Sequence, residues 1–514
     1  MKLNKIEKLK LQEHPCDYYK KLESLQFESL SEADRFYLKN FGIYNMKLRP
    51  EKFMLRLRFL GGRVSFKELE AIWEEIADKD VKILLTARAQ LEIHNLSFQE
   101  AVTMHKNLEK KGVTSFQTLT DNLRNIVTDP LDGVGEGALI EVYPLMQKME
   151  ELFLKKENFV GMLPRKCNTA ISGTKYNIAS FFGNDIYFAL AKRGDEFGFR
   201  LFLGGRHSDL AKDTNLFVPK DEVVPIFYAV ISAYKKYGRR DSRTKARLFH
   251  LIEEKGVDNF LYKMKEFYGK KYIFGGQFLT GKRDFGDTIF LQDGRVANRY
   301  RTNFGEIPKE IFYKILQLAK SYEIRFGVDQ NIYIFDIKEL NLPTPMDYQN
   351  IVVCAGERYC AFSLLDTKEH AKALPLSLLK RYNIKLHYSG CLKGCGRHIL
   401  ADIGLVGIRT NLFGRVERGV RVYIGGEYTY GKSEARLIFW AVPLRKLNEL
   451  LCVIVEDFAQ SSFNDFEDYA KFLRSYTPEQ LAYYYLKRLA KEEVNIEKEP
   501  THQELKDLEQ RIFS

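Results

Sequence analysis

The feature that most constrains the fold of this chain is an internal repeat. The segment Gly198–Gly205 (GFRLFLGG) returns as Gly419–Gly426 (GVRVYIGG), and each copy is followed by a polar loop and a helical pattern of apolar residues. A weaker repeat joins residues 54–96 to residues 288–335, which share the predicted order strand, helix, strand. The chain is therefore predicted to be an ancient duplication of one small and one large unit. Repeats this far apart predict paired domains about a pseudo-two-fold axis, not a solenoid.

Strand and helix patterns alternate along the 514 residues, enough chain for roughly two to four domains. Several strands alternate apolar and polar residues, which favours an α+β fold over a doubly wound parallel sheet. No G-x-G-x-x-G follows a predicted strand and no Walker A motif occurs, so a redox enzyme of this sequence would receive electrons from another protein. The charged start lacks a signal peptide's apolar core, and no apolar run reaches the length of a membrane span, so we expect a cytoplasmic protein.

More than half of the seven cysteines fall in one stretch. Cys354 and Cys360 have five residues between them, and Cys391 and Cys395 have three. Each pair begins where a short predicted strand ends, and glycines around the second pair would leave room for backbone beside a bulky inorganic group. Grouped thiolates suit an iron–sulfur cluster or a structural zinc, although zinc sites usually place two residues within each pair. Unrelated core cysteines are the third interpretation that the spacing leaves open.

The net charge of +12 has several possible explanations. It would suit binding of nucleic acid, an acidic protein partner or small anions in a basic pocket, and scattered surface lysine would also account for it. Lys and Arg are spread among Asp and Glu, with no basic tail and no recognised RNA-binding motif. Alignment of the repeats adds a hypothesis. The strand with Arg165 and Lys166 in the first large unit takes the place of the strand before Cys391 in the second, which would set cations opposite the metal if the two copies faced each other.

Several motifs in order resemble the sirohaem-dependent nitrite and sulfite reductase family. The resemblance covers nearly the whole chain and includes both cysteine spacings. It rests on the segments YLKNFGIYNMKLRPEKFMLRLRFLGG (37–62), LTARAQLEIHNL (85–96), DNLRN (121–125), NFVGMLPRKCN (158–168) and GCGRHILADIGLVG (394–407).

The resemblance implies an α+β fold duplicated about a pseudo-two-fold axis, with a pair of ferredoxin-like half-domains and two larger mixed α/β domains for sirohaem and the cluster. The implied parts are an N-terminal arm (1–45), a first half-domain (46–134), a first larger domain with the substrate lysine strand (135–284), a second half-domain (285–345), and a second larger domain with the cluster cysteines and a C-terminal tail (346–514).

Two cofactors are also implied, a [4Fe–4S] cluster and sirohaem. Cys354, Cys360, Cys391 and Cys395 would bind the cluster, and the Cys395 thiolate would also ligate the sirohaem iron. A shared sulfur couples the two centres electronically, so that electrons arriving singly can reach the haem face where substrate binds. Arg88 matches a position that binds a sirohaem carboxylate.

Arg56, Arg124 and Lys166 match the family's anion-binding positions, and cations suit a small oxyanion that loses its oxygen as water. Arg58 is two residues from Arg56 and could share its strand face, but the motif favours Arg56. At the position of Asn168, sulfite reductases tend to carry lysine and nitrite reductases asparagine. Because nitrite carries one charge and sulfite two, Asn168 favours nitrite.

The chain departs from the family pattern at a few positions. Leu392 and Lys393 replace a common Pro-Asn after the third cysteine, and Leu84 stands where an arginine for sirohaem carboxylates is usual. We expect Lys82 or Lys393 to supply the missing charge.

The predicted function is the six-electron reduction of nitrite to ammonium by a cytoplasmic enzyme with a ferredoxin-type donor, whose acidic surface the basic chain would suit. An assimilatory sulfite reductase, which forms sulfide, is the alternative on the same scaffold. A zinc-containing nucleic-acid-binding protein is the alternative of another class. For the enzyme, neither nucleic acid nor a membrane is an expected partner.

Overall fold

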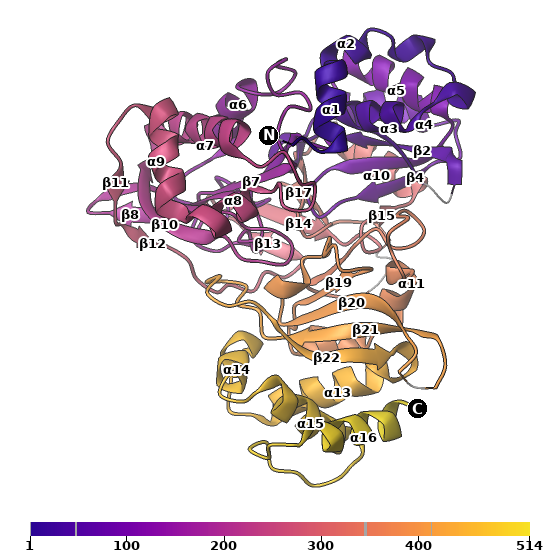
Figure 1. Cartoon of the computed structure of the whole chain (residues 1–514), viewed down its shortest axis with the longest axis vertical. Helices are drawn as coiled ribbons and strands as arrows, with labels where there is room; N and C mark the ends of the chain where they lie inside the picture. The colour runs from indigo at the N-terminus through magenta and orange to yellow at the C-terminus, as the bar shows by residue number, and fades with distance from the viewer. Residues whose placement is uncertain (1, 47–48, 344–346, 413) are drawn as a thin grey trace. The chain divides into compact units, whose positions relative to one another are not determined.

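The computed structural model describes residues 2–46, 49–343, 347–412 and 414–514 (Figure 1). The chain divides into two compact units. Unit 1 comprises Met1–Arg206 and Ala211–Thr344, and unit 2 comprises His207–Leu210 and Pro345–Ser514. The predicted domain boundary at residues 345–346 lies outside the described residues, and the finer boundaries stay a prediction.

Unit 1 contains two small five-stranded sheets, one for each half of the weaker repeat. Their orders are β1-β2-β5-β4-β15 and β13-β14-β17-β16-β3. Each sheet takes its last strand from the other half, because β15 (Glu306–Ile307) pairs with β4 and β3 (Arg63–Val64) pairs with β16. The remaining elements are β1 (Ile43–Met46), β2 (Arg49–Leu57), α4 (Phe66–Ile76), β4 (Lys82–Leu85), β5 (Leu91–Leu96), α5 (Phe98–Lys110), β13 (Thr288–Phe290), β14 (Val296–Tyr300), α10 (Lys309–Leu318), β16 (Ile324–Phe326) and β17 (Ile332–Phe335).

Glycine makes both strand exchanges possible. Gly62, just before β3, has a φ of +79°, and a Cβ there would lie 2.0 Å from the carbonyl oxygen of Phe326. Gly305, just before β15, has a φ of +95°, and its Cβ would lie 2.5 Å from the carbonyl oxygen of Leu85. A side chain is disfavoured at both positions because the backbone is left-handed and because a carbonyl oxygen lies too close. The chain therefore needs glycine just before each exchanged strand.

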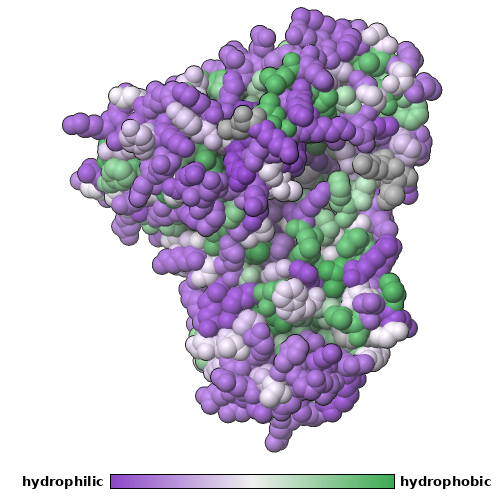
Figure 2. Space-filling model, viewed as in Figure 1, coloured by the Kyte–Doolittle hydropathy of each residue, from purple (hydrophilic) through white to green (hydrophobic). Residues whose placement is uncertain are grey.

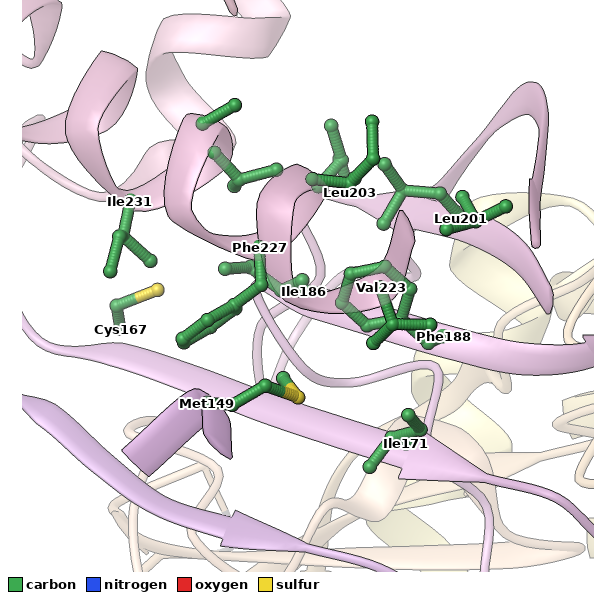
Figure 3. Close-up of a cluster of buried hydrophobic side chains, with 14 of the residues drawn as sticks. Met149, Cys167, Ile171, Ile186, Phe188, Leu201, Leu203, Val223, Phe227 and Ile231 are labelled. Atoms are coloured by element: carbon green, nitrogen blue, oxygen red, sulfur yellow. The ribbon is translucent and has the colours of Figure 1, made fainter. Parts of the chain in front are cut away.

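The rest of unit 1 is built on a larger sheet with the order β11-β10-β9-β8-β7-β6. Strands β6, β7 and β8 run parallel, and β8 to β11 run antiparallel. The core of this part includes strand residues such as Phe188 and residues of α7 such as Phe227 and Ile231 (Figure 3). The elements are β6 (Leu123–Val127), α6 (Tyr143–Glu151), β7 (Cys167–Ser172), β8 (Ile186–Arg193), β9 (Glu196–Leu203), β10 (Lys212–Pro219), α7 (Val223–Tyr237), α8 (Leu248–Lys255), α9 (Val257–Tyr268), β11 (Ile273–Phe274) and β12 (Gln277–Phe278), which pairs with β8.

Unit 2 repeats this sheet in the order β18-β19-β20-β21-β22, again with three parallel strands followed by antiparallel ones. The repeated glycine-rich segments fall on the equivalent strands β9 and β21, so the predicted α+β fold and its duplication are confirmed. Helix α13 packs on β21 and β22 (Figure 1). The elements are β18 (Ile351–Val353), α11 (Thr367–Lys372), α12 (Leu376–Arg381), β19 (Leu386–Ser389), β20 (Ile403–Thr410), β21 (Glu417–Ile424), β22 (Arg436–Pro443), α13 (Leu444–Gln460), α14 (Phe466–Leu473), α15 (Pro478–Leu489) and α16 (His502–Phe513).

The N-terminal arm of unit 1 consists of short helices, α1 (Lys5–Gln12), α2 (Pro15–Tyr19) and α3 (Glu32–Leu38). On the face shown in Figure 2 the surface is mainly hydrophilic, and hydrophobic residues gather over strands β20 and β21 of unit 2. Within the described residues, no helix combines the length and the apolar character that crossing a bilayer requires.

Candidate substrate and cluster sites

A group of arginines converges in unit 1 from separate elements. Arg56 lies on β2, Arg124 on β6, Arg165 just before β7, and Arg88 in the turn after β4. Burial, followed by the like charges of Arg56, Arg165 and Arg88, lowers the pKa of the Arg124 guanidinium well below its ordinary value. Each of these three side chains is therefore close enough to repel Arg124, and such an excess of positive charge around a buried arginine suits an anionic ligand.

Only some of the hydrogen-bond donors of these arginines have partners in the protein. Arg124 Nη2 donates to the carbonyl oxygen of Thr120 at 3.0 Å, and Arg56 forms an ion pair with Glu92. Although burial alone would raise it, Arg56 and then His94 lower the pKa of the Glu92 carboxyl to about 2. Among the described residues, the Nε atoms of Arg56 and Arg124 are buried and have no hydrogen-bond partner. Buried donors without partners are costly, so they point to a ligand that completes the site.

The guanidinium of Arg88 lies against protein groups. Its Nη1 donates to Asn184 Oδ1 at 2.8 Å, and its Nη2 donates to the carbonyl oxygens of Asn125 and Thr169. Arg88 therefore links β6, β7 and the turn before β8. Binding of a haem carboxylate by Arg88 stays a prediction.

Lys166 directly precedes β7, and Asn168 is the second residue of this strand. Asn168 is 2% exposed, and its backbone N–H donates to Asp185 Oδ2 at 2.7 Å. Its side-chain Nδ2 is buried without a hydrogen-bond partner among the described residues. Cys167 lies in the hydrophobic cluster that holds Ile231 of α7, as expected for a core cysteine (Figure 3).

Leu84 and the two lysines that were expected to replace its missing charge lie in different surroundings. Leu84 is a buried residue of β4, paired with Glu92 of β5. The Lys82 side chain is 63% exposed, with its Nζ 3.9 Å from Asp80. Lys393 Nζ lies 2.7 Å from the ring centroid of Phe362. Replacement of the missing charge by Lys82 or Lys393 stays a prediction.

The four cysteines of unit 2 come from two loops that follow neighbouring strands. Cys354 follows β18 directly, and Cys391 follows β19 after one glycine. Burial raises the pKa values of the Cys354, Cys360 and Cys391 thiols, and Cys395 raises each of them further, so all four lie within electrostatic range. Within the described parts of the chain, no three Cys, His, Asp or Glu side chains converge as ligands of a single metal ion do.

The donor set fits an iron–sulfur cluster, which takes one thiolate for each iron. Cys354 Sγ accepts a hydrogen bond from the backbone N–H of Gly390 at 3.1 Å. Thr367 Oγ1 donates to the carbonyl oxygen of Cys354 at 3.1 Å and lies 3.7 Å from its Sγ. Donors close to a ligand sulfur stabilise negative charge on it and tune its metal centre.

Two of the glycines beside the second cysteine pair, Gly390 and Gly396, lie against other parts of the protein. A Cβ at Gly390 would lie 1.9 Å from Ser363 Oγ, and one at Gly396 would lie 2.4 Å from the carbonyl oxygen of Tyr388. These glycines therefore let the protein's own loops pack closely, and they do not show room kept for an inorganic group.

The equivalence of β7 and β19 refines the repeat hypothesis. Arg165 and Lys166 precede β7, whereas Cys391 and Cys395 follow β19. The cations and the thiols therefore sit at opposite ends of equivalent strands. Their placement across from each other stays a prediction.

A duplicated α+β scaffold with arginines gathered around the buried Arg124 and a four-thiol set is typical of redox enzymes that act on small anions. A sequence model described as the nitrite and sulphite reductase 4Fe-4S domain matches residues 119–272 and 347–473. The chain belongs to this family of oxidoreductases, and the family's cofactors, a [4Fe–4S] cluster and sirohaem, are those of this chain.

Named relatives extend over almost the full length. The ferredoxin–nitrite reductase of Synechococcus elongatus is 30% identical, over 88% of this chain and 95% of its own. The chloroplastic ferredoxin–nitrite reductase of Oryza sativa is 25% identical, over 89% of this chain and 85% of its own. The solved structure of the Mycobacterium tuberculosis NirA protein superposes with a TM-score of 0.84 at 23% identity, covering 93% of this chain and 97% of that one, and shows that the fold is shared. The names of these relatives favour the enzyme over the zinc-containing nucleic-acid-binding alternative.

Proposed function

We propose that this protein reduces nitrite to ammonium with six electrons from a ferredoxin-type donor. The relatives whose length it matches are named ferredoxin–nitrite reductases. The reaction consumes eight protons and releases two water molecules, so the site must hold an anion and supply donors to departing oxygens. When bound, sirohaem and the cluster supply an iron centre and one-electron steps.

The residues proposed to hold the anion are Arg56, Arg124 and Lys166, with Asn168 as a neutral donor. The observation that carries this assignment is the set of buried donors without protein partners, Arg56 Nε, Arg124 Nε and Asn168 Nδ2, among the described residues. A small oxyanion offers the acceptors that these donors lack, and its charge offsets the mutual repulsion of the arginines.

The cofactor assignment follows the same logic. Cys354, Cys360, Cys391 and Cys395 are proposed to bind the [4Fe–4S] cluster, with Cys395 shared with the sirohaem iron. Arg88 is proposed to face a sirohaem carboxylate, for which the excess of cations in unit 1 is suited. A cytoplasmic location is part of the proposal.

Sulfite reduction is the second candidate, because the scaffold is common to both activities. Asn168 makes sulfite the less favoured substrate. Sulfite is a dianion, for which a second lysine would be better suited than the neutral asparagine at this position. The test is turnover of nitrite and sulfite side by side by protein co-expressed with sirohaem synthesis, using reduced ferredoxin. Higher kcat/KM for nitrite is expected, and a higher value for sulfite would replace the proposal with the second candidate.

A further inference from the structure

The loop that leads to Lys166 is held by side chains from outside it. Four consecutive carbonyl oxygens each accept a hydrogen bond from a different side chain. The pairs are Arg240 Nη2 to Met162 at 3.1 Å, Lys10 Nζ to Leu163 at 2.7 Å, Arg243 Nη1 to Pro164 at 3.4 Å and Tyr234 Oη to Arg165 at 3.3 Å. The backbone before Lys166 is therefore fixed residue by residue, and one of the donors comes from helix α1 of the N-terminal arm.

A buried carboxylate ties this loop to the strand that carries Arg124. The Asp121 side chain is fully buried and forms ion pairs with Lys10 at 3.0 Å, with Arg165 at 3.4 Å and with Arg243. The Asp121 carbonyl oxygen also accepts the backbone N–H of Leu163 at 3.3 Å. Asp121 thus joins the segment before β6 to the segment before β7.

Lys10 connects both segments through one ammonium group. It contacts the carbonyl oxygen of Leu163, three residues before Lys166, and the carboxylate of Asp121, three residues before Arg124. Its side chain is only 2% exposed, and its third partner is Glu7 at 2.6 Å. A lysine this buried needs all of its donors satisfied, so its position is sharply defined.

We propose that Lys10 is a positioning residue for the anion site: it holds the Arg124 segment and the Lys166 segment at the spacing that a bound oxyanion requires. The proposal rests on the proposed function, because it takes Arg124 and Lys166 as anion-binding residues. It gives the N-terminal arm a part in substrate affinity without contact to the substrate.

A purely structural role for Lys10 makes a different prediction. Anchoring alone would change stability and cofactor content but not the affinity of correctly loaded enzyme. Lys5 provides a matched control, because it lies on the same helix and pairs with Glu32 at 3.0 Å with both side chains about three-quarters exposed. Exposed pairs of this kind contribute little.

The experiment compares Lys10→Met, Lys10→Gln, Lys5→Met and Lys166→Met with the parent as full-length holoenzyme. The dissociation constant of nitrite is measured from the change in sirohaem absorbance, and KM and kcat from turnover, all normalised to sirohaem content. Lys10→Met is expected to raise Kd and KM about tenfold, as for loss of one charged hydrogen bond, with kcat within about twofold. Lys10→Gln keeps a donor for Leu163 and is expected to fall between Lys10→Met and the parent, and Lys5→Met to match the parent.

The outcomes separate this inference from the proposed function. A raised Kd in Lys166→Met with a parental Kd in Lys10→Met and Lys10→Gln would overturn the positioning role alone. An unchanged Kd in Lys166→Met would overturn the anion site and the inference with it. If Lys10→Met does not fold, Lys10→Gln decides, and loss of sirohaem from both variants would replace the positioning role with a structural one.

Discussion

The ion pair between Glu92 and Arg56 allows a prediction whose size and sign follow from the structure. The Glu92 side chain on β5 is 4% exposed, and its second oxygen lies 2.8 Å from His94 Nε2. Arg56 and His94 hold the pKa of this carboxyl at about 2, against an ordinary value of 4.5. At 1.36 kcal/mol per pKa unit, the charged form of Glu92 contributes about 3 kcal/mol to folding.

The sign follows from linkage. The pKa is lower in the folded protein, so the contribution is fully present above about pH 4.5 and is lost as the pH falls toward about 2. Glu92→Gln removes the charge at every pH and leaves the partly buried Arg56 cation near Arg124 without its counter-charge. We therefore expect the free energy of unfolding at neutral pH to fall by about 3 kcal/mol, and the difference between variant and parent to shrink as the pH falls from about 4.5 toward 2.

The same variant is expected to lower stability but to raise the affinity of the anion site for nitrite. Without Glu92 as counter-charge, Arg56 is expected to bind nitrite more tightly. Nitrite at 100 times Kd stabilises either protein by about 2.7 kcal/mol, so at one nitrite concentration the variant should gain more stability than the parent. The assay is thermal unfolding followed by circular dichroism, with and without nitrite. Glu74→Gln is the control, because Glu74 pairs with Lys111 in solvent and its loss should cost less than about 1 kcal/mol. Equal midpoints for Glu92→Gln and Glu74→Gln, or weaker nitrite binding by Glu92→Gln, would refute the reasoning.

Three further predictions concern substrate and cluster. Asn168→Lys is expected to shift relative kcat/KM from nitrite toward sulfite by about tenfold, measured with both anions in parallel, and an unchanged ratio would contradict the role of this residue. Cys395→Ala is expected to lose iron and acid-labile sulfide in metal analysis, whereas Cys452→Ala in α13 should keep both; equal contents would remove Cys395 from the ligand set. Thr367→Val removes the hydroxyl 3.7 Å from Cys354 Sγ and is expected to lower the midpoint potential of the cluster in a redox titration followed by electron paramagnetic resonance. Thr367→Ser should keep the parental potential, and no difference between the two variants would show that the hydroxyl does not act on the sulfur.

The repeat was visible in the sequence because both copies keep long strands with an apolar pattern. The exchange of β3 and β15 between the small sheets was not, since a two-residue strand carries no periodicity. The only trace of the exchange is glycine at Gly62 and Gly305, and many turns need glycine for other reasons. Strand patterns therefore predicted the units but not how they interlock.

The arginines of the candidate site were found by motif, whereas Lys10 was not found. In sequence Lys10 is one of several lysines in a charged N-terminal stretch, which is typical of an exposed helix. Its burial depends on Asp121 and Leu163, more than a hundred residues away in the chain. Long-range pairing of this kind leaves no local signal, so only the folded structure could reveal it.

The duplicated loops carry different residues at equivalent positions in the two units. Strand pairing of β7 with β8 and of β19 with β20 makes Thr174 the counterpart of Cys391, each after a serine and a glycine. Pairing of β6 with β7 and of β18 with β19 likewise makes Asp129 the counterpart of Cys354.

In unit 1 the Asp129 carboxylate accepts the backbone N–H groups of Leu131 at 2.9 Å and Ile178 at 2.6 Å, so the loop is closed by its own hydrogen bonds. In unit 2 the equivalent thiol instead accepts the backbone N–H of Gly390 and is the softer ligand that an iron–sulfur cluster requires. Equivalent positions therefore carry different chemistry: the Asp129 carboxylate accepts backbone hydrogen bonds of its own loops, whereas the Cys354 thiol is proposed to bind the cluster.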